Sequence, residues 1–181
     1  LKNLSEATSI PKIFSEKGSY KIPHQMEKLK DGLFYMTFTR VKRVPVIVLL
    51  KALGLIKDEQ IMKSINIEDN SEVVVNLYDF IDIKTEEDAL DYVAKKIGIT
   101  QSKDIRLTRT QEILDKYLLP HLGTTKEVRQ LKAYNIAKYL NKFIKVENGI
   151  LPIDDKDHYQ NKRIKLSGDL MADLFRVNLK V

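Results

Sequence analysis

The first forty or so residues alternate between apolar and polar positions, as β-strands do. Three such runs cover residues 10–15, 20–28 and 33–40. In the third run Phe34, Met36 and Phe38 share one face, because successive side chains of a strand point to opposite sides. The Asp31-Gly32 pair before that run is typical of a hairpin turn. The pattern therefore predicts a three-stranded antiparallel meander.

From Pro45 onward the apolar positions recur at helical spacing instead. Pro45 suits the first position of a helix that runs to Leu53, and Gly54 suits its end. Further helices are predicted from residue 58, over residues 71–80, 85–98, 108–119 and 125–145, and from residue 167. The Thr85-Glu86-Glu87-Asp88 segment approximates a capping box at the start of one of them.

Two of these helices have apolar stripes that predict their buried sides. One stripe, in helix 85–98, consists of Ala89, Tyr92, Val93 and Ile97. The other, in helix 125–145, consists of Leu131, Tyr134, Ala137, Leu140 and Ile144. The change of period at Pro45 predicts an α+β fold within one domain, residues 1–181. A small antiparallel β-meander, residues 1–44, packs beside a mainly helical body, residues 45–181.

The composition narrows the function classes without selecting one. A net charge of +6 permits a polyanionic partner such as nucleic acid. The absence of cysteine excludes disulfides and thiolate chemistry and fits a reducing cytoplasm. The longest apolar run, residues 44–50, is about a third of the length that spans a membrane. We therefore expect a cytoplasmic protein with no membrane partner, and its two ends predict a part of a longer polypeptide.

Residues for catalysis or metal binding are hard to find. The three histidines, His24, His121 and His158, are far apart in sequence and form no His-x-x-x-His pair. Phosphate-binding glycine loops and a Gly-x-Ser-x-Gly elbow are absent. The acidic run at residues 154–157 could offer oxygen ligands to a cation, but it lacks the other ligands of a calcium loop. We predict a solvated acidic turn there, and no catalytic residue, metal site or cofactor in this chain.

The polar segment over residues 155–165 is the most informative candidate site. Its cations are Lys156, Lys162, Arg163 and Lys165. Together with Asn161 and the helix-opening amides near residue 167, they suit contact with phosphates. Asp157 could orient a neighbouring arginine or accept a hydrogen bond from a base. The alternative is a charged surface loop with local salt bridges, which the pattern alone slightly favours.

Four blocks of the chain resemble one family in the right order. Residues 155–163 are similar to the Asp-x-Asp-His-x-Gly-Asn-Lys/Arg-Arg signature of the second-largest subunit of archaeal and eukaryotic DNA-directed RNA polymerases. A helix containing Leu174-Phe175 follows, as in that family. The other similar blocks are residues 44–61, 88–93 and 113–122. The chain resembles the lobe domain, or domain 2, of that protein. Its short spacers favour the archaeal form, and within it the N-terminal polypeptide of the second-largest subunit.

This resemblance implies a domain that forms one wall of the DNA cleft, on the downstream side. It implies DNA contact by Asp157, Asn161, Lys162, Arg163 and Lys165. It also implies partners among other domains and subunits of the polymerase and, further, general initiation factors. The polymerase's magnesium would be held by another subunit, so the fragment alone would be inactive. Gln160 departs from the family, which has glycine there, and a glutamine would not adopt a positive φ cheaply.

Two other classes compete with this interpretation. A free-standing basic DNA-binding regulator would present a compact recognition helix rich in Arg, Asn and Gln, which the sequence does not show. A small hydrolase or transferase would need a clustered acid and base, which is also missing.

Overall fold

The computed structural model describes residues 10–17, 20–39, 41–66, 71–153, 158–162 and 164–179. The chain begins with four strands, β1 (Lys12–Lys17), β2 (Tyr20–Lys28), β3 (Phe34–Phe38) and β4 (Val41–Pro45). They form one antiparallel sheet in the order β1-β2-β3-β4. Seven α-helices follow in the described part of the chain, so the predicted α+β fold is confirmed.

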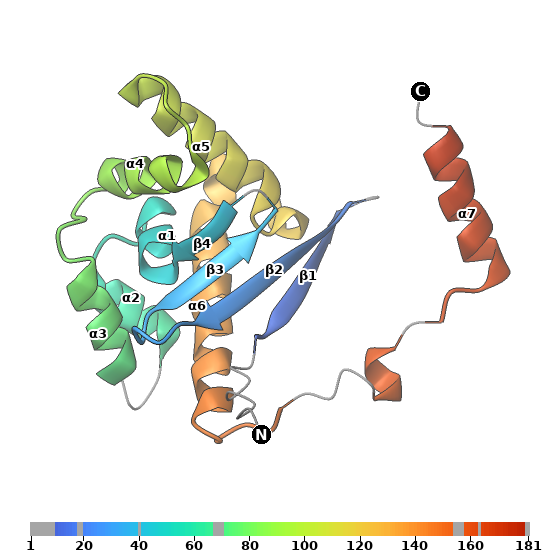
Figure 1. Cartoon of the computed structure of the whole chain (residues 1–181), viewed down its shortest axis with the longest axis horizontal. Coiled ribbons are helices and arrows are strands. Elements are labelled where there is room, and N and C mark those ends of the chain that lie inside the picture. The colour runs from blue at the N-terminus through green and yellow to red at the C-terminus, as the bar shows by residue number, and fades with distance from the viewer. Residues whose placement is uncertain are drawn as a thin grey trace, which may run out of the picture.

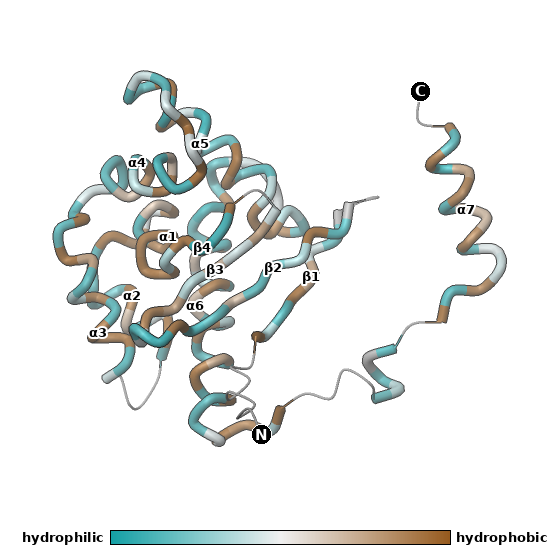
Figure 2. Tube along the Cα trace, in the orientation of Figure 1, coloured by the Kyte–Doolittle hydropathy of each residue, from teal (hydrophilic) through white to brown (hydrophobic). Residues whose placement is uncertain are grey.

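All of the helices except the last, α7, lie on one side of the sheet and at its ends (Figure 1). The helices are α1 (Val46–Ala52), α2 (Asp58–Ile65), α3 (Ser71–Asp79), α4 (Glu86–Ile97), α5 (Lys103–Tyr117), α6 (Arg129–Glu147) and α7 (Ser167–Asn178). The 3-10 turns are η1 (Pro120–Leu122), η2 (Lys126–Val128) and η3 (Tyr159–Asn161). Figure 1 shows α6 crossing behind the sheet and α7 standing apart from the body. In Figure 2, brown apolar segments recur along α7.

The fourth strand, β4, was missed by the sequence prediction of three strands. Its inward residues, Val41 and Val44, are three positions apart, with Lys42 and Arg43 exposed between them. A register shift between β3 and β4 and the positive φ of Arg43, 49°, mark a β-bulge. Because a bulge inserts a residue, it breaks the alternation by which strands are found in a sequence.

The other strands follow the predicted pattern with shifted ends. Phe34, Met36 and Phe38 all face the core from β3, as predicted. β1 extends to Lys17, two residues beyond the predicted run 10–15. Glu16 pairs with Lys21 across the hairpin, so these residues continue the ladder instead of leaving it.

Helix α1 is buried on every side, from Val46 to Ala52. Pro45 was predicted as its first helical residue, but Pro45 pairs with Tyr35 as the last residue of β4 and serves as the N-cap. Strand and helix thus join without a loop. Contacts from α4, α6, β3 and β4 enclose the helix.

Helix α6 turns a different side to the core from the one predicted. Ala137, Leu140 and Ile144 are buried as expected, whereas Leu131 and Tyr134 are about half exposed. Steps of three residues fall roughly 60° short of a full helical turn, so a stripe built from such steps drifts off the face. The buried side also includes residues outside that stripe: Lys132, Ala133, Ile136 and Phe143.

The predicted start is correct for helix α4 and wrong for helix α5. Thr85 caps α4 as predicted, because its hydroxyl oxygen accepts a hydrogen bond from the Asp88 amide at 3.1 Å. Helix α5 begins at Lys103, five residues before the predicted start at Thr108. Its first turn is mostly polar and exposed, so apolar periodicity could not reveal it.

Two lysine side chains are buried and satisfy the carbonyl groups at helix ends. The Lys51 Nζ donates to the carbonyl oxygens of Phe80 at 3.1 Å and Ile83 at 3.0 Å, just after α3. The Lys132 Nζ donates to the Asp115 carbonyl oxygen at 2.7 Å, near the end of α5. A buried charge is costly unless hydrogen bonds replace its water, and helix C-termini supply the acceptors. These two ammonium groups therefore tie α1 to the turn after α3 and α6 to the end of α5.

His24 ties the sheet to the turn after α5. Its imidazole is fully buried and stacks on the ring of Phe38, with ring centroids 5.4 Å apart. The Nε2 atom accepts a hydrogen bond from the Leu119 amide at 3.1 Å, and Leu119 is in the left-handed region at φ 44°. Burial lowers the pKa of His24 from 6.5 to about 4, because desolvation disfavours the charged ring.

Stability should therefore depend on pH through His24. The unfolded chain takes up the His24 proton near pH 6.5 and the folded chain only near pH 4. The stabilisation is complete above about pH 6.5 and is lost as the pH falls toward 4, by up to about 3 kcal/mol. Urea unfolding between these pH values should show a flatter pH dependence in His24→Gln, which keeps an acceptor but does not titrate. An equal flattening in the control His158→Gln, at an exposed histidine, would contradict this assignment.

Candidate nucleic-acid interface

The predicted DNA-contacting loop is described only in part. Asp157 and Arg163 lie outside the described residues, as does the side chain of Asn161. At η3, the His158 Nδ1 accepts a hydrogen bond from the Gln160 amide at 3.2 Å and so starts the turn. Gln160 lies in this turn without a positive φ. The local backbone therefore has no need for the glycine that the family carries at this position.

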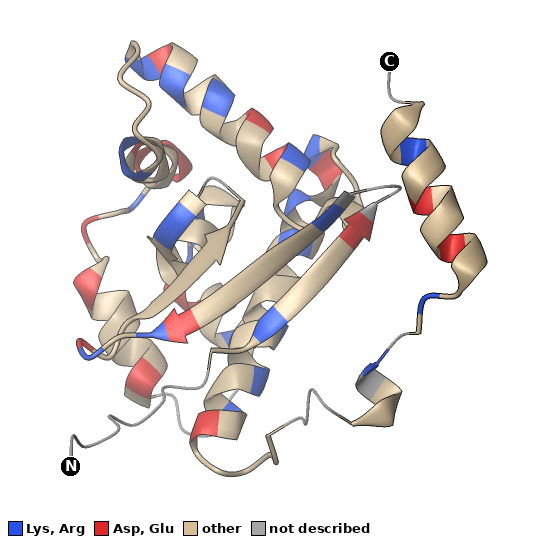
Figure 3. Ribbon diagram, turned by 45° about the vertical axis from the view of Figure 1, so that its right-hand side comes forward, with Lys and Arg blue, Asp and Glu red and all other residues tan. Residues whose placement is uncertain are grey.

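Lys162 and Lys165, the two described cations of the loop, are both exposed. Figure 3 shows blue basic segments along the chain that leads to α7. The Lys165 Nζ forms an ion pair with the Asp173 carboxylate at 2.7 Å, and this hydrogen bond raises the pKa of Lys165. Asp173 also accepts from the Arg176 guanidinium at 3.2 Å. Lys165 therefore stays charged at neutral pH and is held in part by a partner on α7.

The N-terminus of α7 is already occupied by an acid. The Asp169 carboxylate accepts a hydrogen bond from the Leu166 amide at 3.1 Å. A carboxylate at this end compensates the helix dipole, as a phosphate would. The predicted helix-opening amides near residue 167 thus have a resident negative charge beside them, so the loop lysines are the better candidates for phosphate contact.

The buried Ser15 contacts the exposed His121, although the sequence had suggested scattered histidines. The Ser15 Oγ lies 2.7 Å from the His121 Nδ1, and the His121 amide donates back to Ser15 Oγ at 3.3 Å. Ser15 is buried, and no described carboxylate bonds to His121. Because nucleophilic catalysis needs an accessible hydroxyl and an oriented base, we interpret the pair as a structural link between β1 and η1. These residues are 106 positions apart, so no sequence signal could have paired them.

The described part of the chain offers neither a metal site nor a membrane span. No three His, Asp or Glu side chains gather there in a way that could hold a metal ion. The described residues therefore do not fit the magnesium ion that the resemblance to RNA polymerases implies for the whole enzyme. None of the described helices is long and apolar enough to cross a membrane.

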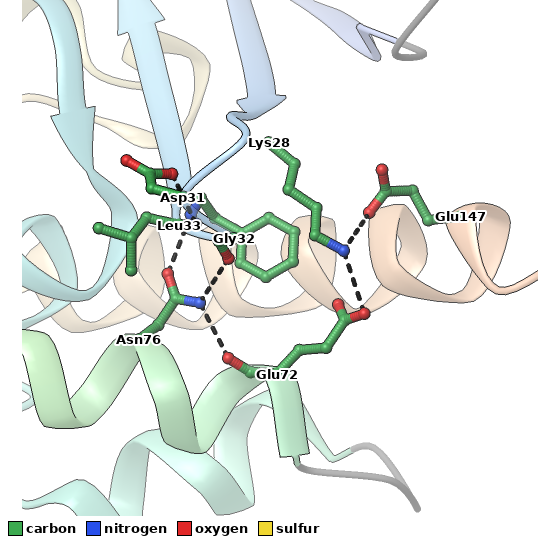
Figure 4. Close-up of polar contacts among 8 residues, drawn as sticks. Lys28, Asp31, Gly32, Leu33, Glu72, Asn76 and Glu147 are labelled. Atoms are coloured by element: carbon green, nitrogen blue, oxygen red, sulfur yellow. Dashed lines mark hydrogen bonds and ion pairs between the residues drawn. The ribbon is translucent and has the colours of Figure 1, made fainter. Parts of the chain in front are cut away.

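A buried polar cluster joins the β2–β3 hairpin to α3 and α6 (Figure 4). The Asn76 side chain accepts from the Phe34 amide at 2.9 Å and donates to the Gly32 carbonyl oxygen at 3.1 Å. Beside it, the Lys28 Nζ lies 3.0 Å from Glu72 and 3.1 Å from Glu147. Partial burial opposes the charge of Lys28, but the hydrogen bonds to the two glutamates outweigh it and raise the Lys28 pKa. We interpret this cluster as a clamp that holds the hairpin and not as a ligand site.

Comparison with known proteins decides the family. Residues 6–165 match the family described as RNA polymerase Rpb2, domain 2. The chain belongs to this family. The Rpb2 domain 2 match spans the sheet and α1 to α6 and ends just before α7. It confirms the resemblance predicted from the sequence.

Archaeal RNA polymerase subunits are among the relatives of this Rpb2 domain 2 chain. It is 40% identical over 179 residues to the DNA-directed RNA polymerase subunit Rpo2 of Saccharolobus solfataricus. This match covers 97% of the present chain and 16% of the relative. The chain is 39% identical over 172 residues to the subunit Rpo2N of Methanocaldococcus jannaschii, in a match that covers 92% of this chain and 34% of the relative. The chain thus spans between a sixth and about a third of these relatives.

The clamp at Asn76 should contribute measurably to stability. Asn76→Ala leaves the buried Phe34 amide without its acceptor, which should lower the unfolding free energy by about 2 kcal/mol. Asn135→Ala is the matched control, because the Asn135 side chain bonds only to a carbonyl of its own helix, and its loss should stay below about 0.5 kcal/mol. Urea unfolding at neutral pH compares them, and equal losses would show that the clamp is dispensable.

Proposed function

We propose that this chain is one domain of the second-largest subunit of a DNA-directed RNA polymerase, where it forms a wall of the DNA cleft. The match to the Rpb2 domain 2 family carries the proposal. Relatives with 34–40% identity are named as subunits of that polymerase. Their sequences continue far beyond the matched part, which favours a domain of a large subunit over a free-standing DNA-binding regulator.

The chain contributes shape and charge to transcription, and the complete enzyme performs nucleotidyl transfer. The magnesium ion of the reaction belongs to another subunit. The purified chain is therefore inactive by itself, and RNA synthesis by it would contradict the proposal.

The loop over residues 155–165 meets DNA in the assembled polymerase. Lys162, Arg163 and Lys165 contact phosphates, Asn161 adds a neutral donor, and Asp157 reads a base or orients Arg163. Lys165 can exchange Asp173 for a phosphate, because an exposed ion pair contributes little stability. The loop alone has few cations, so the cleft supplies the remaining affinity by holding DNA against several surfaces at once.

Helix α7 packs against a neighbouring part of the longer subunit. Its apolar residues at helical spacing are each more than half exposed: Leu170, Met171, Leu174 and Phe175. Such a stripe is normally covered, because exposed apolar patches mark interaction sites. The domain match ends at residue 165, before α7, and the relatives continue well beyond it. General initiation factors are further partners, bound on the outer surface of the domain in the cytoplasm.

Removing the loop cations should weaken promoter opening. In a reconstituted polymerase, alanine at residues 162, 163 and 165 should shorten the lifetime of the open complex. It should also reduce the log–log salt slope by up to about 2.7, since each lost phosphate contact removes about 0.9. The matched control replaces three exposed lysines elsewhere, Lys57, Lys84 and Lys96.

The same assay separates the two roles of Asp157. Asp157→Ala should have an effect that depends on promoter sequence if the carboxylate reads a base, and an equal effect on every promoter if it orients Arg163. An open-complex lifetime that the triple substitution leaves unchanged at every salt concentration would reject the DNA role of the loop.

Substitutions on α7 should affect assembly and not the fold of this chain. Leu170→Ser with Leu174→Ser should leave the unfolding free energy of the chain nearly unchanged, because both side chains are exposed here. In the longer subunit the same change should lower solubility and polymerase assembly, measured by co-purification with the other subunits. The control Arg176→Gln changes the polar side of α7. Normal assembly of the double variant would refute the docking of α7.

A further inference from the structure

The outer side of α6 carries a line of cations that the loop hypothesis does not use. Tyr134, Lys138, Lys142 and Lys145 lie at positions i, i+4, i+8 and i+11, which place them on one stripe of the helix. Lys138 and Lys142 are exposed, Tyr134 is 46% exposed and Lys145 is half-buried. These four residues are called the α6 ridge below. The ridge lies opposite the apolar side of the helix, so packing does not account for its composition.

The charge of the ridge is not neutralised within the described structure. Helix α6 contains five basic residues and one acidic residue, Glu147. Glu147 bonds to Lys28, Arg129 pairs with Asp115, and Lys132 is buried against carbonyl groups. None of the ion pairs among the described residues involves the three lysines of the ridge. The ridge therefore presents three ammonium groups in a row.

We propose that the α6 ridge binds the phosphate backbone of duplex DNA, as a second contact surface of the domain. The inference rests on the proposed polymerase function for its partner. Lysine is a flexible point charge that suits phosphate, whereas ion pairs in protein interfaces favour arginine, and lysine is depleted there. The hydroxyl of Tyr134 adds a hydrogen-bond donor of a kind that often contacts phosphates.

The dimensions of the ridge match a DNA strand. Seven residues separate Lys138 from Lys145, which is about 10 Å along the helix axis. A strand of duplex DNA presents a phosphate about every 3.4 Å along its axis, so roughly three phosphates lie within that length. One strand can therefore occupy all three ammonium groups when it runs beside α6. The contact carries no sequence information, because it reaches only the backbone.

Glutamine at the three ridge lysines tests the proposal in the full chain. Binding of a fluorescently labelled duplex is measured by anisotropy over about 50 to 200 mM salt. The log–log salt slope should be smaller by about 2.7 in the ridge variant than in the wild type. The ratio of wild-type to variant affinity should therefore be about 40 times larger at 50 mM salt than at 200 mM salt. The matched control, Lys57→Gln with Lys84→Gln and Lys96→Gln, removes the same charge from exposed positions outside α6 and should change the slope by less than about 1. Unchanged urea unfolding of both variants would show that the fold is intact.

Each other outcome of this assay overturns the inference. An equal loss in the control would show that net charge alone attracts DNA, and an unchanged slope in the ridge variant would exclude the contact. Absence of binding by the wild-type chain at the lowest salt would also reject it. Competition by polyglutamate as strong as that by duplex would assign the ridge to an acidic protein instead. The loop variant with alanine at residues 162, 163 and 165 is tested in parallel, so that effects of the ridge and of the loop can be told apart. If only that variant loses binding, the ridge inference fails and the proposed function stands. If only the ridge variant loses binding, the ridge is the surface that binds DNA in the chain by itself, and the loop is tested by the open-complex assay in the assembled polymerase.

Discussion

Helix α1 imposes the constraint on which the rest of the fold depends. Seven consecutive residues, Val46–Ala52, are buried on all sides of the helix. Fully burying one large aliphatic side chain contributes about 1.5–3 kcal/mol, so the helix is stable only where neighbours enclose it. The strands β3 and β4 and the helices α4 and α6 provide that enclosure. Lys51 is the polar exception, and its ammonium group reaches the carbonyl groups after α3, so that even the one charge in α1 helps to position a neighbouring helix.

Much of the fold could be predicted from the sequence, because local periodicity reflects local burial. The inward face of β3 at Phe34, Met36 and Phe38 and the Thr85 cap of α4 are confirmed. The prediction failed where burial depends on partners that are remote in sequence. Strand β4 was missed because a bulge interrupts its alternation of apolar and polar residues. Lys132 was not assigned to the core because its burial depends on carbonyl oxygens at the end of α5. Neither a bulge nor the end of another helix is visible in a hydrophobic pattern.

The two candidate DNA surfaces differ in how they could be found. The loop was recognised because its residues resemble a family signature, and two of them, Asp157 and Arg163, lie outside the described residues. The α6 ridge was concealed by the assignment of Leu131 and Tyr134 to the core. Because Ala133 and Ile136 face the core, Leu131 and Tyr134 lie about half exposed on the solvent side of the helix, which also carries Lys138 and Lys142. The predicted stripe thus assigned two half-exposed residues to the core and overlooked the charged side of the helix.

The contacts that hold the first strands have a consequence for the order of folding. Ser15 meets His121, His24 meets the Leu119 amide, and the Tyr139 hydroxyl donates to the Pro11 carbonyl oxygen at 2.7 Å. Each pair is separated by about a hundred residues or more. A ribosome adds a hundred residues in about 5 to 20 s, and contacts of such separation form late because the loop between them must first close. During synthesis the hairpin of β1 and β2 therefore lacks these contacts until α6 has emerged from the ribosome. In that interval the hairpin is accessible to chaperones and can pair with other chains.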